Sequence, residues 1–313
     1  MSNIVVMGEC MVEFGKAEQA NLYKKSFAGD VFNTGVYIKR CIENQANVSF
    51  LSVVGDDEIS DQMITLMHDE DIDSRFLYRS TQDKMGLYLI NVDNKGERSF
   101  TYWRETSAAK KLMHFIEKDG GIDKLNGIDT LFFSGISIAI LPPEDLFTFW
   151  QYVAQLKSAG THIVFDPNYR PALWPNEEAA RSAFNIAFSL ANVALPGVDD
   201  HIALYKARNA EDVADLLEEI GVDEVVIKNG SQGILVSENG QRSYLKVEPV
   251  KEVIDTTSAG DAFNGGYLSA RLMKKSVTES ALFAANVAKC VIQHKGAIVD
   301  KKAFAEYLIN HPM

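Results

Sequence analysis

The chain has 313 residues, of which 46% are hydrophobic and 24% are charged, a composition typical of a soluble globular protein. The formal net charge of −12 disfavours nucleic acid and anionic membranes as partners, because both are themselves negatively charged. Three widely spaced cysteines, Cys10, Cys41 and Cys290, argue against a disulfide framework or a zinc site and indicate a reducing cytoplasm. The sequence starts with a strand-like run rather than a secretory signal, and it lacks the roughly 18 consecutive apolar residues of a transmembrane helix.

Short β-branched, apolar runs recur along the chain and predict strands at residues 4–7, 48–54, 131–133, 163–165, 193–195 and 225–228. Amphipathic patterns at residues 142–157 and 210–220 predict helices between some of these strands. Strands that alternate with helices indicate a mostly parallel sheet that is covered by helices on both faces. We therefore expect an α/β fold with three αβα layers, in a single domain over residues 1–313.

Two segments interrupt the alternation of strands and helices. The stretch from Cys10 to Phe27 has no clear helical pattern, and residues 86–93 and 99–103 are strand-like segments joined by a turn at 94–97. We interpret them as a small β lid inserted into the α/β body, with lid strands from about residues 10–30 and 85–105. A later hairpin is predicted at residues 233–250, with Glu238-Asn239-Gly240 as its turn.

Residues 253–267, VIDTTSAGDAFNGGY, place small residues before one acid at the start of a helix-like run. Ser258, Ala259 and Gly260 are predicted to form the turn into that helix, whose backbone N–H groups would bind a phosphate. Asp261 at this position would accept the proton of an attacking hydroxyl. The alternative is that Asp261 only caps the helix.

Three further stretches are candidate site segments. In AGDVFNTG (28–35), Gly29, Asp30 and Asn33 would hydrogen-bond a polyol, or else form a plain glycine turn with Asp30 as the N-cap. DPNYRP (166–171) follows a strand, where parallel sheets bind ligands. KNGSQG (228–233) also follows a strand and would border a nucleotide or form an ordinary hairpin turn. Neither a P-loop nor a G-x-G-x-x-G pattern occurs in the chain.

The run DTTSAGDAFNGGY resembles the C-terminal signature of the ribokinase (PfkB-type) carbohydrate kinases, with the pattern D-T-x-G/A-A-G-D. The residues Gly8-Glu9, AGDVFNTG, DPNYRP and KNGSQG occur in that family's order, so the resemblance covers essentially the whole chain. Within the family the chain is most similar to the 2-keto-3-deoxygluconate kinases, through GECMVEF, GLYLINVDNKGERSFTYWR and FDPNYRPALW. The resemblance implies a ribokinase-like fold with a β lid over the sugar.

It also implies the roles of individual residues. Asp261 would be the base, and the amides of Ser258, Ala259 and Gly260 would form the anion hole. Asp255 would contact the sugar, or organise an ion site where the family often binds a monovalent cation such as K⁺, near Gly296-Ala297. The ligand would be ATP with Mg²⁺. The residues that would border the nucleotide are Asn168, Lys228, Gly230, Ser231, Gly233, Ser258, Gly260 and Asn286. The family's N-x-x-E segment is replaced here by PGVDD (196–200), in which Asp200 would reach Mg²⁺ through water.

The side chains of Tyr102 and Arg104 share one face of a strand, because side chains repeat every two residues. An arginine matches the carboxylate of a sugar acid with two parallel hydrogen bonds. Tyr88 would lie over the sugar together with Tyr102 and Arg104, and Arg170 would be a second cation near the phosphates or the carboxylate. We expect ATP-dependent phosphorylation of the terminal hydroxyl of 2-dehydro-3-deoxy-D-gluconate to 2-dehydro-3-deoxy-6-phosphogluconate. The alternatives are a fructokinase or another sugar kinase of this family, and a non-catalytic sugar-binding or sensor protein.

Exposed lid strands would leave unpaired edges and favour a dimer through the lid.

Overall fold

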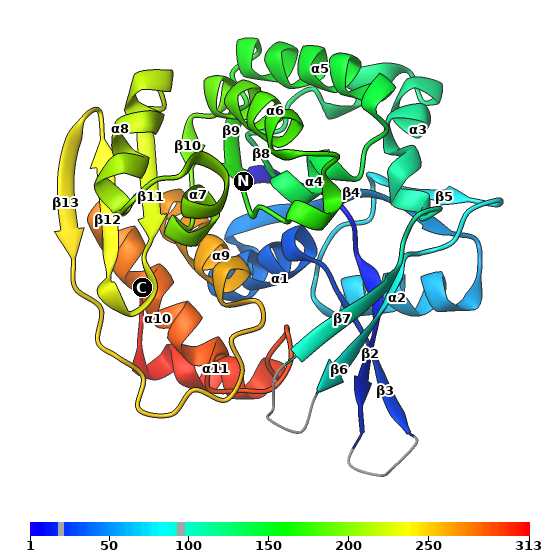
Figure 1. Ribbon diagram of the computed structural model, residues 1–313. Helices are drawn as coiled ribbons and strands as arrows, with labels where there is room; N and C mark the ends of the chain where they lie inside the picture. Colours follow the sequence, from blue (N-terminus) through cyan, green and yellow to red (C-terminus); the bar gives the residue numbers. More distant parts are fainter. Residues whose placement is uncertain (18–21, 93–97) are drawn as a thin grey trace.

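The central element of the fold is a sheet of nine strands (Figure 1). The structure, a computed structural model, describes residues 1–17, 22–92 and 98–313. The strand order is β13-β12-β11-β10-β9-β8-β1-β4-β5, parallel from β11 to β5 and antiparallel at β12 and β13. The strands are β1 (Ser2–Met7), β4 (Ala46–Gly55), β5 (Leu77–Ser80), β8 (Thr130–Ser134), β9 (His162–Asp166), β10 (Val193–Ala194), β11 (Glu224–Lys228), β12 (Ile234–Glu238) and β13 (Gln241–Leu245).

Helices cover both faces of this sheet, which confirms the predicted α/β fold. Alternate residues of β1 point into different cores: Ile4 and Val6 into one, Val5 and Met7 into the other. One face is covered by α1 (Asp30–Ile42), α2 (Glu58–Asp69), α9 (Ala259–Leu272) and α10 (Val277–Val291). The other is covered by α3 (Leu112–Lys118), α4 (Gly135–Ala139), α5 (Leu146–Ser158), α6 (Glu177–Leu190), α7 (Val198–Tyr205) and α8 (Ala210–Ile220).

The C-terminal helix α11 (Lys301–Asn310) contacts α1 and α10. Helix α8 has the bounds predicted for it, whereas the predicted helix at 142–157 begins at Leu146, after a short 3₁₀ turn. Within the described residues, none of the helices combines the length and the apolar character needed to span a membrane.

A second sheet of four strands, in the order β3-β2-β6-β7, projects beside the body (Figure 1). It consists of β2 (Met11–Lys16), β3 (Tyr23–Ala28), β6 (Leu87–Val92) and β7 (Arg98–Trp103). The two segments that interrupt the alternation of strands and helices form this sheet, with β2 and β6 paired in parallel. The turn predicted at 94–97 lies outside the described residues.

The predicted later hairpin is present as β12 and β13, but it ends at Leu245 rather than at residue 250. Asn239 and Gly240 form its two-residue turn, with φ angles of 52° and 77°. Positive φ at both central positions is typical of the type I′ turn, which suits the twist of a two-stranded ribbon.

Helices α1 and α9 lie side by side (Figure 1), and Gly265 permits their close approach. A Cβ atom at Gly265 would lie 2.6 Å from the Cβ of Tyr37 and 3.0 Å from the carbonyl oxygen of Thr34. Both neighbours belong to α1, and one of them is backbone, so a larger residue would separate the helices.

We therefore expect Gly265→Ala to lower the free energy of unfolding by about 1–3 kcal/mol, the range for an overpacked core. Denaturant unfolding measures this change. Gly15→Ala is the matched control, because a Cβ there meets no atom within 4 Å. Equal destabilisation by the two substitutions would contradict the role of Gly265 as a spacer between α1 and α9.

Candidate active site

A cavity of about 670 Å³ lies at the carboxyl ends of the parallel strands, where open α/β sheets bind their ligands. Loops after β1, β9 and β11, the amino end of α9 and strands of the second sheet contribute to it. Most of the site residues predicted from the sequence line this cavity: Gly29, Asp30, Asn33, Tyr88, Tyr102, Arg104, Asn168, Arg170, Asp200, Lys228, Gly230, Ser258, Ala259, Gly260 and Asp261.

Four predicted site residues do not line the cavity in the described part of the chain: Ser231, Gly233, Asp255 and Asn286. Ser231 is exposed on a 3₁₀ turn, and Asn286 is half-buried on α10. Asp255 is buried, and its carboxylate accepts hydrogen bonds from the amides of Thr257 (2.9 Å) and Gly296 (2.8 Å). It thereby ties the segment before α9 to the loop after α10.

The turn before Asp261 differs slightly from the prediction. Ser258 is the N-cap of α9, in the left-handed conformation at φ 64°, and Ala259 and Gly260 already belong to the first turn of the helix. The amides of this turn have no partner within the helix, and they carry its partial positive charge. The amide of Ala259 donates to the carbonyl oxygen of Thr256, before the helix, at 3.2 Å. A phosphate is therefore favoured at this point in the cavity.

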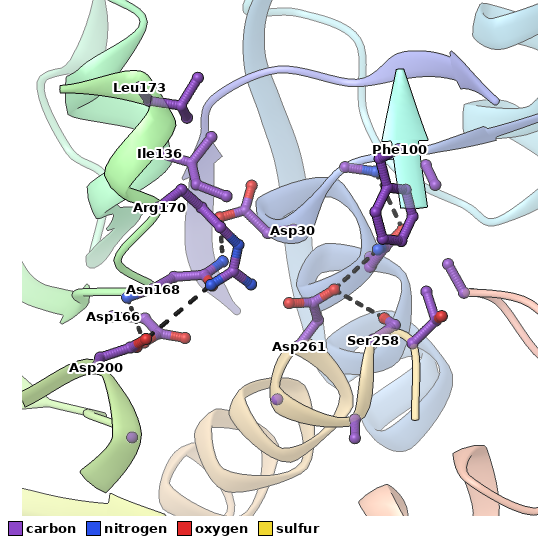
Figure 2. A pocket seen from close by; sticks show the side chains of 18 of the residues that line it. Asp30, Phe100, Ile136, Asp166, Asn168, Arg170, Leu173, Asp200, Ser258 and Asp261 are labelled. Atoms are coloured by element: carbon purple, nitrogen blue, oxygen red, sulfur yellow. Dashed lines mark hydrogen bonds and ion pairs between the residues drawn. The ribbon is translucent and has the colours of Figure 1, made fainter. Parts of the chain in front are cut away.

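The carboxylate of Asp261 lies in the same helical turn, and its position is fixed by two donors (Figure 2). Its Oδ2 accepts hydrogen bonds from Nδ2 of Asn33 (2.9 Å) and from Oγ of Ser258 (2.8 Å). Burial and the negative charge of Asp30 raise the pKa of Asp261 to about 7, although these two hydrogen bonds act in the opposite direction. A carboxylate with such a pKa is a competent base at neutral pH.

Asp30 faces the cavity from the first turn of α1. Gly29 is the N-cap of this helix, so the alternative with Asp30 as the cap is wrong. A Cβ at Gly29 would lie only 2.0 Å from the carbonyl oxygen of Glu9, so close contact of the two backbones requires a glycine here. Oδ2 of Asp30 accepts a hydrogen bond from Nδ2 of Asn168 (2.9 Å) (Figure 2).

An ion pair that lines the cavity joins the body to the second sheet. Arg104 follows β7, and its Nη2 donates to Oε2 of Glu9, which follows β1. The two side chains are 11% and 2% exposed, so the charges are largely shielded from water. Glu9 was not predicted as a site residue, although an acid directly after the first strand is the kind of position that contributes to such sites.

The aromatic residues of the second sheet pack beside this ion pair. The guanidinium carbon of Arg104 lies 5.9 Å from the ring centre of Tyr102, and the rings of Tyr102 and Tyr88 are 5.6 Å apart. The hydroxyl of Tyr88 donates to the buried carboxylate of Glu13. Because this hydroxyl is engaged inside the second sheet, Tyr88 offers the cavity its ring.

A lysine, an aspartate and an asparagine form a polar cluster near the amino end of α9. Nζ of Lys228 is 3.0 Å from Oδ2 of Asp166 and 3.1 Å from Oδ1 of Asn264, and Nδ2 of Asn264 is 2.6 Å from the same Asp166 oxygen. Asp166 and Asn264 were not predicted as site residues. Asp166 begins the DPNYRP stretch, but a buried asparagine inside a helix gives no signal in the sequence.

Arg170 and Asp200, which also line the cavity, form a long ion pair of 4.0 Å (Figure 2). Burial and the charge of Asp166 raise the pKa of Asp200 to about 6, while Arg170 and Lys228 oppose the shift. Within the described residues, no group of three or more acidic, histidine or cysteine side chains is arranged to hold a metal ion. Mg²⁺ binds one or two carboxylates together with phosphate oxygens and waters, so Asp200 and Asp166 fit an ion that arrives with a triphosphate.

The family model of pfkB family carbohydrate kinases matches residues 1–303 of the chain. The 2-dehydro-3-deoxygluconokinase of Haemophilus influenzae is 37% identical over 308 residues, which cover 97% of this chain and 98% of that protein. The enzyme of the same name from Escherichia coli is 36% identical, over 96% of this chain and 98% of that protein.

Solved structures of this family have the same fold. A PfkB protein from a Polaromonas species superposes with a TM-score of 0.82 at 25% identity, over 97% of this chain and 99% of that one. A Vibrio cholerae fructokinase variant was solved in a fructose, ADP and potassium ion bound form. It superposes with a TM-score of 0.81 at 25% identity, over 98% of each chain.

A candidate ribokinase II from Escherichia coli, solved in complex with ATP and Mg²⁺, has a TM-score of 0.85 at 20% identity, over 99% of this chain and 100% of that one. The family match extends over nearly the whole sequence, and the site has an acid beside the amino end of a helix. The chain therefore belongs to the pfkB family of carbohydrate kinases.

Proposed function

We propose that this kinase transfers the γ-phosphoryl group of ATP to the terminal hydroxyl of 2-dehydro-3-deoxy-D-gluconate, also called 2-keto-3-deoxygluconate. The observation that carries the proposal is the location of Asp261 beside the amino end of α9, in one cavity with Arg104. The cavity thus offers a base for a hydroxyl, a helix terminus for a phosphate and a cation for a carboxylate. Relatives at 36–37% identity with this activity support the choice of sugar acid.

In the proposed reaction, Asp261 accepts the proton of the terminal hydroxyl while the acceptor oxygen forms a bond to the γ-phosphorus. The bond between that phosphorus and the β,γ-bridging oxygen breaks, and its electron pair remains on ADP. The amides of Ser258, the N-cap of α9, and of Ala259 and Gly260 in its first turn would hold the transferring group. Asn33 orients the base through its 2.9 Å hydrogen bond.

The nucleotide would run from the amino end of α9 past Asn168, Lys228 and Gly230. Ser231, Gly233 and Asn286, which lie outside the cavity itself, would border its outer part. Kinases of this family use ATP and a divalent metal. Here Asp200 and Asp166 would hold Mg²⁺, which neutralises phosphate charge when it is bound.

A monovalent cation is a further expectation near Asp255 and the loop at Gly296-Ala297. It is supported by the hydrogen bond that ties Gly296 to Asp255 and by the potassium ion of the Vibrio cholerae fructokinase variant. Exchange of potassium for a bulky organic cation in the assay should then lower kcat, and an unchanged kcat would exclude the site.

The sugar acid would lie between the second sheet and α1. Arg104 would pair with its carboxylate, the rings of Tyr88 and Tyr102 would cover it, and Gly29, Asp30 and Asn33 would contact its hydroxyls. Arg170, which is half exposed near Asp200, is the second cation for phosphate or carboxylate. We propose that the second sheet acts as the lid of one kinase domain and excludes water from the phosphoryl group.

A substrate panel tests this assignment. We expect phosphorylation of 2-dehydro-3-deoxygluconate with a kcat/KM at least roughly 100-fold above that for fructose, because fructose leaves the charged Arg104 site without a carboxylate. Arg104→Ala should raise the KM of the sugar acid by roughly 100-fold and leave the KM of ATP nearly unchanged. A preference for fructose would support the alternative of a fructokinase.

Substitution of the base gives a second test. Asp261→Asn should lower kcat by roughly 100-fold or more, with little change in nucleotide affinity, because the amide cannot accept the proton. In the wild type, kcat/KM for the sugar should fall as the pH decreases below about 7, since protonation of Asp261 removes the base. Near-normal turnover of the variant would disprove the assignment of the base.

Two copies of the chain are proposed to pair through their second sheets. Strands β3 and β7 form the edges of that sheet, and Tyr23 and Trp103 on them are 54% and 52% exposed. Light scattering should report the mass of a dimer, and Trp103→Glu should convert it to a monomer. A wild-type monomer would refute the pairing.

The three cysteines are free thiols, which supports a reducing compartment such as the cytoplasm.

A further inference from the structure

Three residues from distant parts of the chain form a closed triangle of polar contacts beside the proposed phosphoryl site. Lys228 ends β11, Asp166 ends β9 and Asn264 lies in the second turn of α9. The amide oxygen of Asn264 accepts from Lys228, and its nitrogen donates to Asp166. Asn264 is 1% exposed, so both ends of its side chain are used inside the protein.

The ammonium of Lys228 lies close to the backbone that is proposed to hold the phosphate. A Cβ atom built on Gly260 would lie 3.8 Å from this nitrogen. Gly260 belongs to the first turn of α9, so the ammonium adds a full positive charge to the partial charge of the helix terminus. Lys228 and Gly260 both line the cavity.

The triangle leaves the ammonium able to bind a ligand. A lysine has three N–H donors, and in the described part of the chain Asp166 and Asn264 engage two of them. The lysine side chain is 17% exposed, whereas that of Asp166 is 6% exposed. Because Lys228 lines the cavity, its remaining donor is available to a ligand there, while the carboxylate of Asp166 is engaged with Lys228 and Asn264.

Asn264 also links the cation to the proposed base. It follows Asp261 by three residues on α9, and residues at this spacing lie on the same face of a helix. The helix therefore carries the base, the phosphate-binding amides and the support of the lysine as one rigid unit.

We infer that Lys228 is a catalytic residue that neutralises the charge on the departing nucleotide, and that Asn264 and Asp166 are positioning residues that aim it. This inference rests on the proposed phosphoryl transfer. As the bond between the γ-phosphorus and the bridging oxygen breaks, its electron pair stays on the β-phosphate of ADP. A cation held at that point stabilises the transition state more than the ground state, because the charge on the bridging oxygen grows during the step.

The test is a double-mutant cycle in the full-length protein. Lys228→Met should lower kcat by roughly 100-fold, as expected for the loss of one preorganised group. Asn264→Leu, which keeps the size of the side chain, should lower kcat by roughly 10-fold and leave the KM of the sugar within about twofold. In the Lys228→Met background, Asn264→Leu should have no further effect on kcat, because Asn264 acts through the lysine.

Asn192→Leu is the matched control for a purely structural asparagine. Its side-chain oxygen accepts from the amide of Ile163 (2.8 Å) at the amino end of the sheet, far from the cavity along β9. This variant should lower the melting temperature without changing kcat. If Asn264 were only structural, Asn264→Leu would behave in the same way, or would reduce kcat equally with and without Lys228.

Two outcomes would overturn the inference: an unchanged kcat in Lys228→Met, or independent effects of the two substitutions on kcat. If Asn264→Leu does not fold, Asn264→Asp retains the shape and the acceptor but loses the donor to Asp166, and the same cycle applies. The cycle uses whichever sugar the wild type phosphorylates in the panel. A wrong sugar assignment and a wrong role for Lys228 therefore give different results.

Discussion

The contact between α1 and α9 determines the geometry of the site. Because Gly265 lets the two helices approach, the amide of Asn33 on α1 reaches the carboxylate of Asp261 on α9. The hydroxyl of Thr34 also donates to the backbone carbonyl of Asp261 at 3.2 Å. One helix therefore supplies the base, and the other holds it and presents Asp30 to the same cavity.

Among the residues that the structure describes, the three cations of the cavity are each paired with an acid of the protein. Arg104 pairs with Glu9, Lys228 with Asp166 and Arg170 with Asp200. The two pairs of the largely buried Arg104 and Lys228 hold these long side chains in one position, so less conformational entropy is lost when an anionic ligand binds. The protein has a net charge of −12, and acids outnumber cations in the lining of the cavity, so these cations act as individual partners for anionic groups of the ligands.

The body and the second sheet meet at the proposed substrate. Glu9 comes from the end of β1 in the large sheet, and Arg104 comes from the end of β7 in the small one. Since this ion pair is shielded from water, the loss of either partner would leave a buried charge uncompensated. The residue that is proposed to recognise the carboxylate thus also holds the two sheets together beside the cavity.

Short-range patterns in the sequence predicted most strands of the large sheet, helices α5 and α8, and the start of α9 near Asp261, because each depends on residues that are neighbours in the chain. They also predicted that Arg104 and Tyr102 share one face of a strand. In the structure Arg104 lies just beyond the end of β7, although both residues line the cavity. The tertiary structure alone decided which distant groups meet: Glu9 with Arg104, Asn33 with Asp261, and Asn264 with Lys228 and Asp166. The tertiary structure also determines that the hydroxyl of Tyr88 donates to Glu13. These contacts join positions up to 228 residues apart, and they depend on helix packing and sheet order, which no local pattern encodes.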